Sequence, residues 1–133
     1  VGRTFIKPTQ KERESAVHLK LSVLSSVVKG KRLVLIDDSI VRGTTMASLI
    51  RMLKDAGATE VHGRISSSPF LFPCYYGTDV PSNDQLIASS HTAAEICASI
   101  GADSLGYMKL EDLKQMTGDL PLCKACFDSH YPV

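Results

Sequence analysis

The chain has 133 residues, of which 44% are hydrophobic and 22% charged, and its formal net charge is +1. This composition is typical of one soluble globular unit with enough apolar residues for a core, and it excludes a disordered chain. No segment has the apolar length of a membrane span, and the near-neutral charge argues against a broad nucleic-acid surface. We therefore expect no membrane and no nucleic acid as partner.

The first predicted element is a helix from about Gln10 to Val28, which Gly30 ends. The apolar residues that mark one face of this helix are Val17, Leu21, Leu24 and Val28. The next element is a strand at Arg32–Ile36. Its apolar run has no polar alternation, which is typical of a parallel strand covered on both faces.

A helix with an apolar stripe at Met46, Leu49, Ile50 and Leu53 follows, with Gly57 suited to its C-terminal cap. Thr59–Ile65 suits a second strand, Cys97 falls within a predicted helix, and a short helix is predicted near Glu111–Met116. This order of elements indicates the α/β class.

The residues between the first strand and the next helix carry the clearest functional pattern. Asp37 and Asp38 follow the strand, where parallel sheets present ligands, and suit sugar hydroxyls or a hard cation such as Mg²⁺. Gly43 permits unusual backbone angles, and the helix that Thr44 and Thr45 open has free N–H groups that can surround a phosphate. Arg42 adds positive charge if its side chain turns inward. The pattern predicts a site for a phosphorylated sugar.

Each piece alone is also typical of a plain turn or a helix N-cap, and only the joined order favours a ribose-phosphate site. The Gly-Lys-Ser/Thr ending of a Walker P-loop is missing from this chain.

The cysteines form a second group. Cys123 and Cys126 make a C-x-x-C pair, Cys74 lies well upstream, and Cys97 lies in the predicted helix. A disulfide, a redox pair and a metal site are the competing interpretations, of which a zinc or iron–sulfur site is the better alternative. Cys97 is expected to pack in the core, and His18 and His91 to be surface or capping residues.

The segment Val34–Thr45 is similar to the phosphoribosyl pyrophosphate (PRPP) motif of type I phosphoribosyltransferases. Together with Arg3–Ile6 and Pro8–Gln10, it resembles the amidophosphoribosyltransferase family. Further segments that carry the resemblance are Arg64–Ser67, Pro73–Cys74, Tyr76–Gly77, Leu86–Ser89, Ile100–Asp103 and Cys126–Phe127. Ser68 stands where the family sequence has a second proline, and the segment between Tyr107 and Cys123 looks shorter than in the family.

The resemblance implies a partial Rossmann-like parallel sheet of the type I phosphoribosyltransferase fold, with a small helical C-terminal region. It implies an enzyme that makes 5-phosphoribosylamine from PRPP and glutamine-derived ammonia, the first step of de novo purine biosynthesis. Asp37 and Asp38 are then implied to be the catalytic pair, which engages the ribose hydroxyls and Mg²⁺. The residues implied to hold the 5′-phosphate are Ser39, Ile40, Val41, Arg42, Gly43, Thr44 and Thr45.

The resemblance also implies a lid over the substrate and an iron–sulfur cluster. The lid residues are Arg3, Thr4, Phe5, Ile6, Pro8, Thr9 and Gln10. Cys74, Cys123 and Cys126 match ligands of a [4Fe-4S] cluster whose fourth cysteine lies outside this chain. We thus expect segment 1–10 to be a lid-like loop and segment 31–57 to be the PRPP-binding unit. Segment 74–126 is expected to be the region that carries the cysteines.

The chain begins at Val1, and we expect residues 1–133 to be the C-terminal portion of a phosphoribosyltransferase domain, inactive by itself, whose N-terminal glutaminase domain is absent. The family further implies a cytoplasmic homo-oligomer that purine nucleotides inhibit by feedback. The alternatives are a PRPP-sensing regulatory domain and a metal-stapled structural domain. A sensor should carry a DNA-binding region, and a structural domain gives no reason for paired acids beside a phosphate loop.

Overall fold

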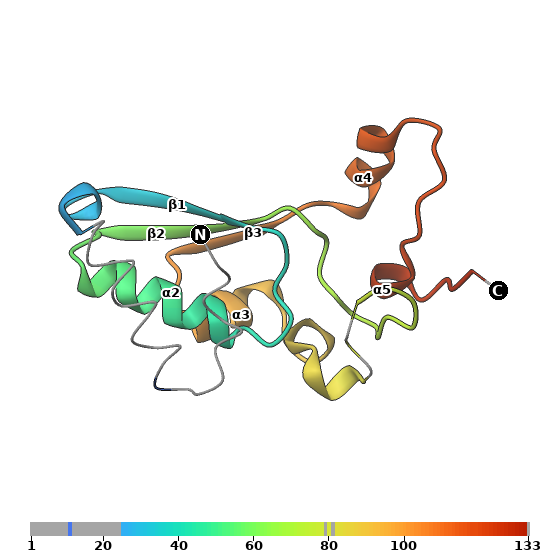
Figure 1. Cartoon of the computed structure of the whole chain (residues 1–133), viewed down its shortest axis with the longest axis horizontal. Helices are drawn as coiled ribbons and strands as arrows, with labels where there is room; N and C mark the ends of the chain where they lie inside the picture. The colour runs from blue at the N-terminus through green and yellow to red at the C-terminus, as the bar shows by residue number, and fades with distance from the viewer. Residues whose placement is uncertain (1–10, 12–24, 79, 81, 133) are drawn as a thin grey trace.

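The structure is a computed structural model that describes residues 11, 25–78, 80 and 82–132. At its centre is a sheet of parallel strands in the order β1-β2-β3, with β1 at Arg32–Asp37, β2 at Glu60–Ile65 and β3 at Ser104–Tyr107. Helix α2 (Thr44–Asp55) connects β1 to β2, and α3 (Ala93–Ile100) lies between β2 and β3. Figure 1 shows both helices on the same face of the sheet. The predicted α/β class and parallel sheet are confirmed.

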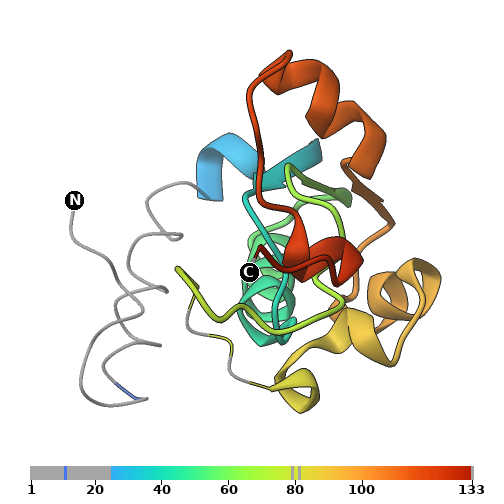
Figure 2. The same cartoon turned by 90° about the vertical axis from the view of Figure 1, so that its right-hand side faces the viewer.

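The remaining elements lie toward the carboxyl ends of the strands. They are η2 (Asn83–Gln85), η3 (Ile87–Ser89), α4 (Leu110–Thr117) and α5 (Ala125–Asp128). Figures 1 and 2 place α4 beyond the strand ends, on the side of the sheet away from α2. Because α4 and α5 are short and follow the last strand, the predicted small helical C-terminal region is confirmed.

The main core lies between the sheet and helices α2 and α3. Helix α2 buries Met46, Ile50 and Leu53, with the predicted spacing of four and three residues. They pack with Val61 of β2 and Ile96 of α3, both almost inaccessible to solvent. Burial of each such side chain stabilises the fold by about 1.5–3 kcal/mol. A smaller cluster, with Phe70, Val80 and Leu86 at its centre, lies beneath the C-terminal region.

The opposite face of the sheet is open in the part of the chain that the structure describes. Strand β1 alternates, so that Leu33 and Leu35 pack on the core while Val34 is 63% and Ile36 is 74% exposed. The prediction of a strand covered on both faces is therefore wrong for the described residues. The physical reason is that both α2 and α3 lie on the same face of the sheet (Figure 1).

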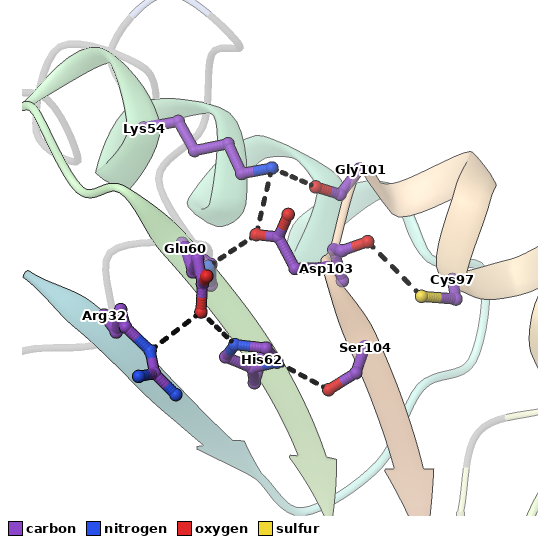
Figure 3. A network of polar contacts seen from close by, with 10 residues as sticks. Arg32, Lys54, Glu60, His62, Cys97, Gly101, Asp103 and Ser104 are labelled. Atoms are coloured by element: carbon purple, nitrogen blue, oxygen red, sulfur yellow. Dashed lines mark hydrogen bonds and ion pairs between the residues drawn. The ribbon is translucent and has the colours of Figure 1, made fainter.

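A row of polar side chains crosses this open face (Figure 3). Arg32 pairs with Glu60 across the β1–β2 register, and Glu60 also accepts a bond from His62, both at 2.9 Å. His62 in turn lies 2.7 Å from the Ser104 hydroxyl. The hydrogen bond from His62 is the main reason that the pKa of Glu60 is lowered.

A second polar group joins α2 to the turn before β3. Lys54 Nζ donates to the Gly101 carbonyl at 2.9 Å and lies 3.3 Å from the Asp103 carboxylate (Figure 3). The same carboxylate accepts the Val61 N–H at 2.7 Å, and this bond is the main cause of the lowered pKa of Asp103. The group fixes the C-terminal end of α2 against β2.

Most predicted elements lie within a residue or two of the observed ones. The second strand begins at Glu60 rather than Thr59, and α4 extends the predicted short helix by one residue at each end. Of the predicted helix Gln10–Val28, residues 25–28 are helical, Lys11 is also helical, and the rest lies outside the described residues. Within the described residues, no helix is both long and apolar enough to cross a membrane.

Candidate substrate-binding site

The paired acids lie where β1 ends. Asp37 is the last residue of the strand and half-buried, and Asp38 follows it in an exposed position. The Asp37 side chain accepts the Asp38 N–H at 2.8 Å, and the Ser39 hydroxyl donates to the Asp38 carboxylate at 2.8 Å. These short local bonds leave other lone pairs of both carboxylates available to a ligand.

The segment after β2 holds the backbone of the two acids. The N–H groups of Ser66 and Ser67 donate to the carbonyls of Asp37 and Asp38, each at 3.0 Å. Met108, after β3, donates to the carbonyls of Ile65 and Ser67. The three strand ends are thereby tied together at one edge of the sheet, so the acids lie on a rigid support.

The loop after the acids is anchored by two side chains. Ile40 is 2% exposed and belongs to the main core, while Val41 packs on the smaller cluster. Both were predicted to hold a phosphate. Because their side chains are directed into the protein, only their backbone groups are available to a ligand.

Gly43 ends this loop and caps α2. It has φ of 85°, in the left-handed region, and an added Cβ would lie 3.3 Å from Ile87 Cδ1. Thr44 begins the helix, as predicted, and no side chain caps its N-terminus. Among the described residues, the backbone N–H groups of Arg42 through Thr45 and the hydroxyls of Thr44 and Thr45 have no hydrogen-bond acceptor. Together with the positive end of the helix dipole, these groups have the donor chemistry that suits an anion.

Arg42 was expected to add charge to the loop if its side chain turned inward. In the structure its Nη2 donates to Gln85 Oε1 at 2.7 Å, so the guanidinium is held by the η2 segment. Sequence reasoning missed Gln85, since nothing local to it signals a partner 43 residues away.

The predicted lid residues, Arg3–Ile6 and Pro8–Gln10, lie outside the described residues, as does His18. His91 is exposed, and its ring lies 2.8 Å from the Ser90 hydroxyl, which agrees with the surface role predicted for it.

Two of the predicted cluster cysteines come from segments that are joined by backbone bonds. Leu71 and Phe72 both donate to the Cys126 carbonyl, and Cys74 pairs with Val80 in an isolated bridge. Tyr131 Oη donates to the carbonyl of Pro73 at 2.8 Å, which ties the C-terminal residues to the same corner. Segment 71–74 and α5 thus form one corner of the molecule.

The thiols at this corner differ in their electrostatics. Backbone N–H groups of Gly77, Tyr76 and Thr78 lower the pKa of Cys74 to about 7, which favours the thiolate that metals bind. Burial first, and then the neighbouring Cys74 among other groups, raises the pKa of Cys126. Cys97 instead lies half-buried in α3 and donates to the Ala102 carbonyl at 3.3 Å.

The donor type at this corner fits an iron–sulfur or zinc site, but the set is incomplete. No group of three His, Cys, Asp or Glu side chains that could hold a metal ion occurs among the described residues. Cys74 and Cys126 therefore do not form a complete site by themselves.

The groups at the carboxyl end of β1 suit a polar ligand whose two ends differ in chemistry. The N–H groups and hydroxyls that begin α2 suit a phosphate, and the carboxylates of Asp37 and Asp38 suit the hydroxyls of a sugar. Carboxylate oxygens are also the ligands that Mg²⁺ prefers. No step of proton transfer is required of these residues in order to bind such a ligand.

A similar segment occurs in known amidophosphoribosyltransferases. The protein of that name from Synechocystis sp. is 52% identical over 135 residues, which cover 100% of this chain and 27% of the relative. The amidophosphoribosyltransferase of Archaeoglobus fulgidus is 52% identical, with 100% and 30% covered, and that of Bacillus subtilis is 50% identical, with 99% and 29% covered. The chain thus spans less than a third of the length of these relatives. No protein-family model matches it.

Two solved structures share the fold. The glutamine PRPP amidotransferase of Bacillus subtilis, complexed with ADP and GMP, superposes with a TM-score of 0.76 at 44% identity, over 98% of this chain and 30% of that one. A structure described as the allosteric regulatory enzyme of purine biosynthesis gives 0.77 at 46% identity, over 99% and 30%. By sequence and by fold, this chain belongs to the amidophosphoribosyltransferase family and corresponds to a part of such a protein.

Proposed function

We propose that this chain is the PRPP-binding portion of an amidophosphoribosyltransferase, which makes 5-phosphoribosylamine from PRPP and glutamine-derived ammonia in purine biosynthesis. The observation that carries the proposal is the loop of free N–H groups beside two carboxylates at the end of β1. Relatives that match this chain over its whole length carry that enzyme name, which supports the proposal. They do not favour the alternatives of a PRPP sensor or a metal-stapled domain.

In the proposed site, the backbone from Ser39 to Thr45 and the hydroxyls of Thr44 and Thr45 hold the 5′-phosphate. Asp37 and Asp38 accept hydrogen bonds from the ribose hydroxyls. When the pyrophosphate leaves, positive charge grows on the sugar ring, and nearby carboxylates stabilise it. Catalysis by this part of the enzyme is therefore mainly positioning and electrostatic stabilisation.

Mg²⁺ fits this site, because Asp37 and Asp38 offer hard oxygen ligands at an accessible strand end. When bound, it would neutralise the charge of the pyrophosphate leaving group. Asp37 and Asp38 would hold it directly or through water.

A [4Fe-4S] cluster is the second proposed cofactor. Cysteine thiolates are its usual ligands, and Cys74 and Cys126 lie at one corner where Cys123 precedes α5. The fourth ligand, and the complete site, would require residues outside this chain.

The remaining proposed partners are those of the full-length protein. Ammonia would come from a glutaminase domain, segment 1–10 would close over PRPP, and the full-length protein would be a cytoplasmic homo-oligomer. The Bacillus subtilis structure is named as a complex with ADP and GMP, which supports purine nucleotides as ligands of the full-length protein.

Calorimetric titration of the purified chain with PRPP, with and without Mg²⁺, tests the proposal. We expect Mg²⁺-assisted binding by the wild type, and a loss of affinity of about tenfold to a hundredfold for each of Asp37→Asn and Asp38→Asn. Asp119→Asn removes the same single charge at an exposed position outside the loop, and this control should bind like the wild type. Absence of binding by a wild-type chain with its native circular dichroism would contradict the proposal.

A further inference from the structure

The phosphate-binding loop rests on the segment that contains η2 and η3. Ile87 N–H donates to the Val41 carbonyl at 2.9 Å, and Arg42 Nη2 donates to Gln85 Oε1 at 2.7 Å. The Ile87 side chain also lies against Gly43, close enough that an added Cβ would be 3.3 Å from it. One backbone bond, one side-chain bond and one packing contact thus join two segments that are distant in sequence.

The first of these bonds decides the direction of an N–H group. In a trans peptide unit the carbonyl and the following N–H point in opposite directions. The Val41 carbonyl points to Ile87, so the Arg42 N–H of the same peptide unit points away from the η3 segment. That N–H has no acceptor among the described residues, and it lies in the loop that we propose for the phosphate.

The acceptor of the second bond lies on a braced segment. Gln85 is half-buried, and its N–H donates to the Ser82 carbonyl. The Ser89 hydroxyl lies 2.9 Å from the Asn83 carbonyl and 2.7 Å from the Leu86 carbonyl, which closes η2 onto η3. Arg42 is exposed and forms no ion pair among the described residues, so Gln85 is its side-chain anchor there.

We propose that Gln85 is a positioning residue for the substrate phosphate. By anchoring the Arg42 side chain, it keeps the Val41–Arg42 peptide unit in the orientation that aims the Arg42 N–H at the anion. Gln85 itself does not touch the substrate. The proposal rests on the proposed function, since it assigns a residue to the same PRPP site.

The test compares two variants that differ in whether residue 85 can accept a hydrogen bond. Gln85→Met keeps the length of the side chain but replaces the amide by a weak acceptor, and we expect its affinity for PRPP with Mg²⁺ to fall about threefold to tenfold. Gln85→Glu restores an oxygen acceptor and is expected to bind within about twofold of the wild type. Gln115→Met, the same change on the exposed surface of α4, is the matched control and should have no effect.

A double-mutant cycle separates this role from a general loss of stability. If Gln85 acts through Arg42, then Gln85→Met causes no further loss of affinity in an Arg42→Met background. The proposal is overturned if Gln85→Met binds like the wild type, if Gln85→Glu loses as much affinity as Gln85→Met, or if the loss is unchanged in the Arg42→Met background.

Hydrogen exchange of the Ile87 amide gives a readout without ligand. Gln85→Met should speed this exchange about threefold or more, and Gln85→Glu should not. A wild-type chain that fails to bind PRPP overturns the proposed function and the substrate role of Gln85 together. Unchanged exchange in Gln85→Met, by contrast, overturns the anchoring of the loop alone.

Discussion

At the scale of single residues, the site depends on a few backbone positions more than on reactive side chains. Gly43 takes a left-handed conformation between the loop after β1 and α2, and a Cβ added to it would lie against Ile87 and Ile100. The carbonyls of Asp37 and Asp38 are fixed by the strand-end segment after β2. The side chains of the two acids are therefore presented on a backbone that hydrogen bonds from the segment after β2 hold in place.

Gly43→Ala tests this backbone requirement. The left-handed conformation costs an alanine about 1–2 kcal/mol, and the contact with Ile87 adds to the loss of unfolding free energy. Gly101→Ala is the control, because Gly101 has φ of 76° but no atom within 4 Å of an added Cβ. Urea denaturation should show the larger loss for Gly43→Ala. Equal losses in the two variants would show that the contact with Ile87 does not matter.

The thiols give a prediction on pH. Because the pKa of Cys74 is lowered to about 7 and that of Cys126 is raised, Cys74 is the more ionised of the two at neutral pH. In reduced, metal-free protein, iodoacetamide should modify Cys74 faster at pH 7, with a rate that rises through about pH 7 and then levels. Peptide mass spectrometry measures both rates. Faster modification of Cys126 at pH 7 would be incompatible with this order of pKa values.

At the scale of elements, the two crossover helices begin in different ways. Helix α3 has Thr92 as its N-cap, whose Oγ1 accepts the Glu95 N–H at 3.2 Å. Helix α2 has Gly43 in that place and no side-chain cap. A helix start without a side-chain cap leaves its N–H groups to water or a ligand, whereas one of these groups is already satisfied in α3.

A pair of threonine variants measures this difference. Thr92→Ala should lower the unfolding free energy by about 1 kcal/mol, because it removes a capping bond. Thr44→Ala should leave the unfolding free energy nearly unchanged and weaken PRPP binding, because the Thr44 hydroxyl has no hydrogen-bond partner among the residues that the structure describes. If Thr44→Ala destabilises the protein as much as Thr92→Ala, the Thr44 hydroxyl has a structural role instead.

Local pattern was enough to predict β1, β2, α2 and the position of the acids relative to Gly43. The apolar stripe of α2 and the apolar run of β1 are signals contained within a few residues. Strand β3 was not predicted, because Ser104–Tyr107 is four residues long, contains a glycine and shows no alternation. The partnership of Arg42 with Gln85 could not be predicted either, since only the fold brings η2 to the loop.

In the molecule as a whole, helices cover only one face of the sheet among the described residues (Figure 1). Helices α2 and α3 cover one face, while Val34 and Ile36 remain exposed on the other. Among the strands that the structure describes, β1 is also an edge strand with backbone groups available for pairing. Exposed apolar side chains on an edge strand favour association with another chain.

We therefore expect the isolated chain to self-associate through β1. Sedimentation equilibrium should show oligomers of the wild type whose fraction rises with concentration, and Val34→Thr with Ile36→Thr should shift the chain to monomers. Val27→Thr, a change at another exposed valine, is the control and should not alter the distribution. A monomeric wild type, or oligomers that the double variant leaves unchanged, would contradict this expectation.

The proposed role of the loop from Asp37 to Thr45 is to bind the phosphate and ribose of PRPP within this chain. Titration of the ¹⁵N-labelled chain with PRPP and Mg²⁺, followed by NMR of the backbone amides, tests it most directly. We expect the largest shifts at the amides of Arg42, Gly43, Thr44 and Thr45, which have no acceptor among the described residues. Shifts that spare these four amides, or no shifts at all from a folded chain, would contradict it.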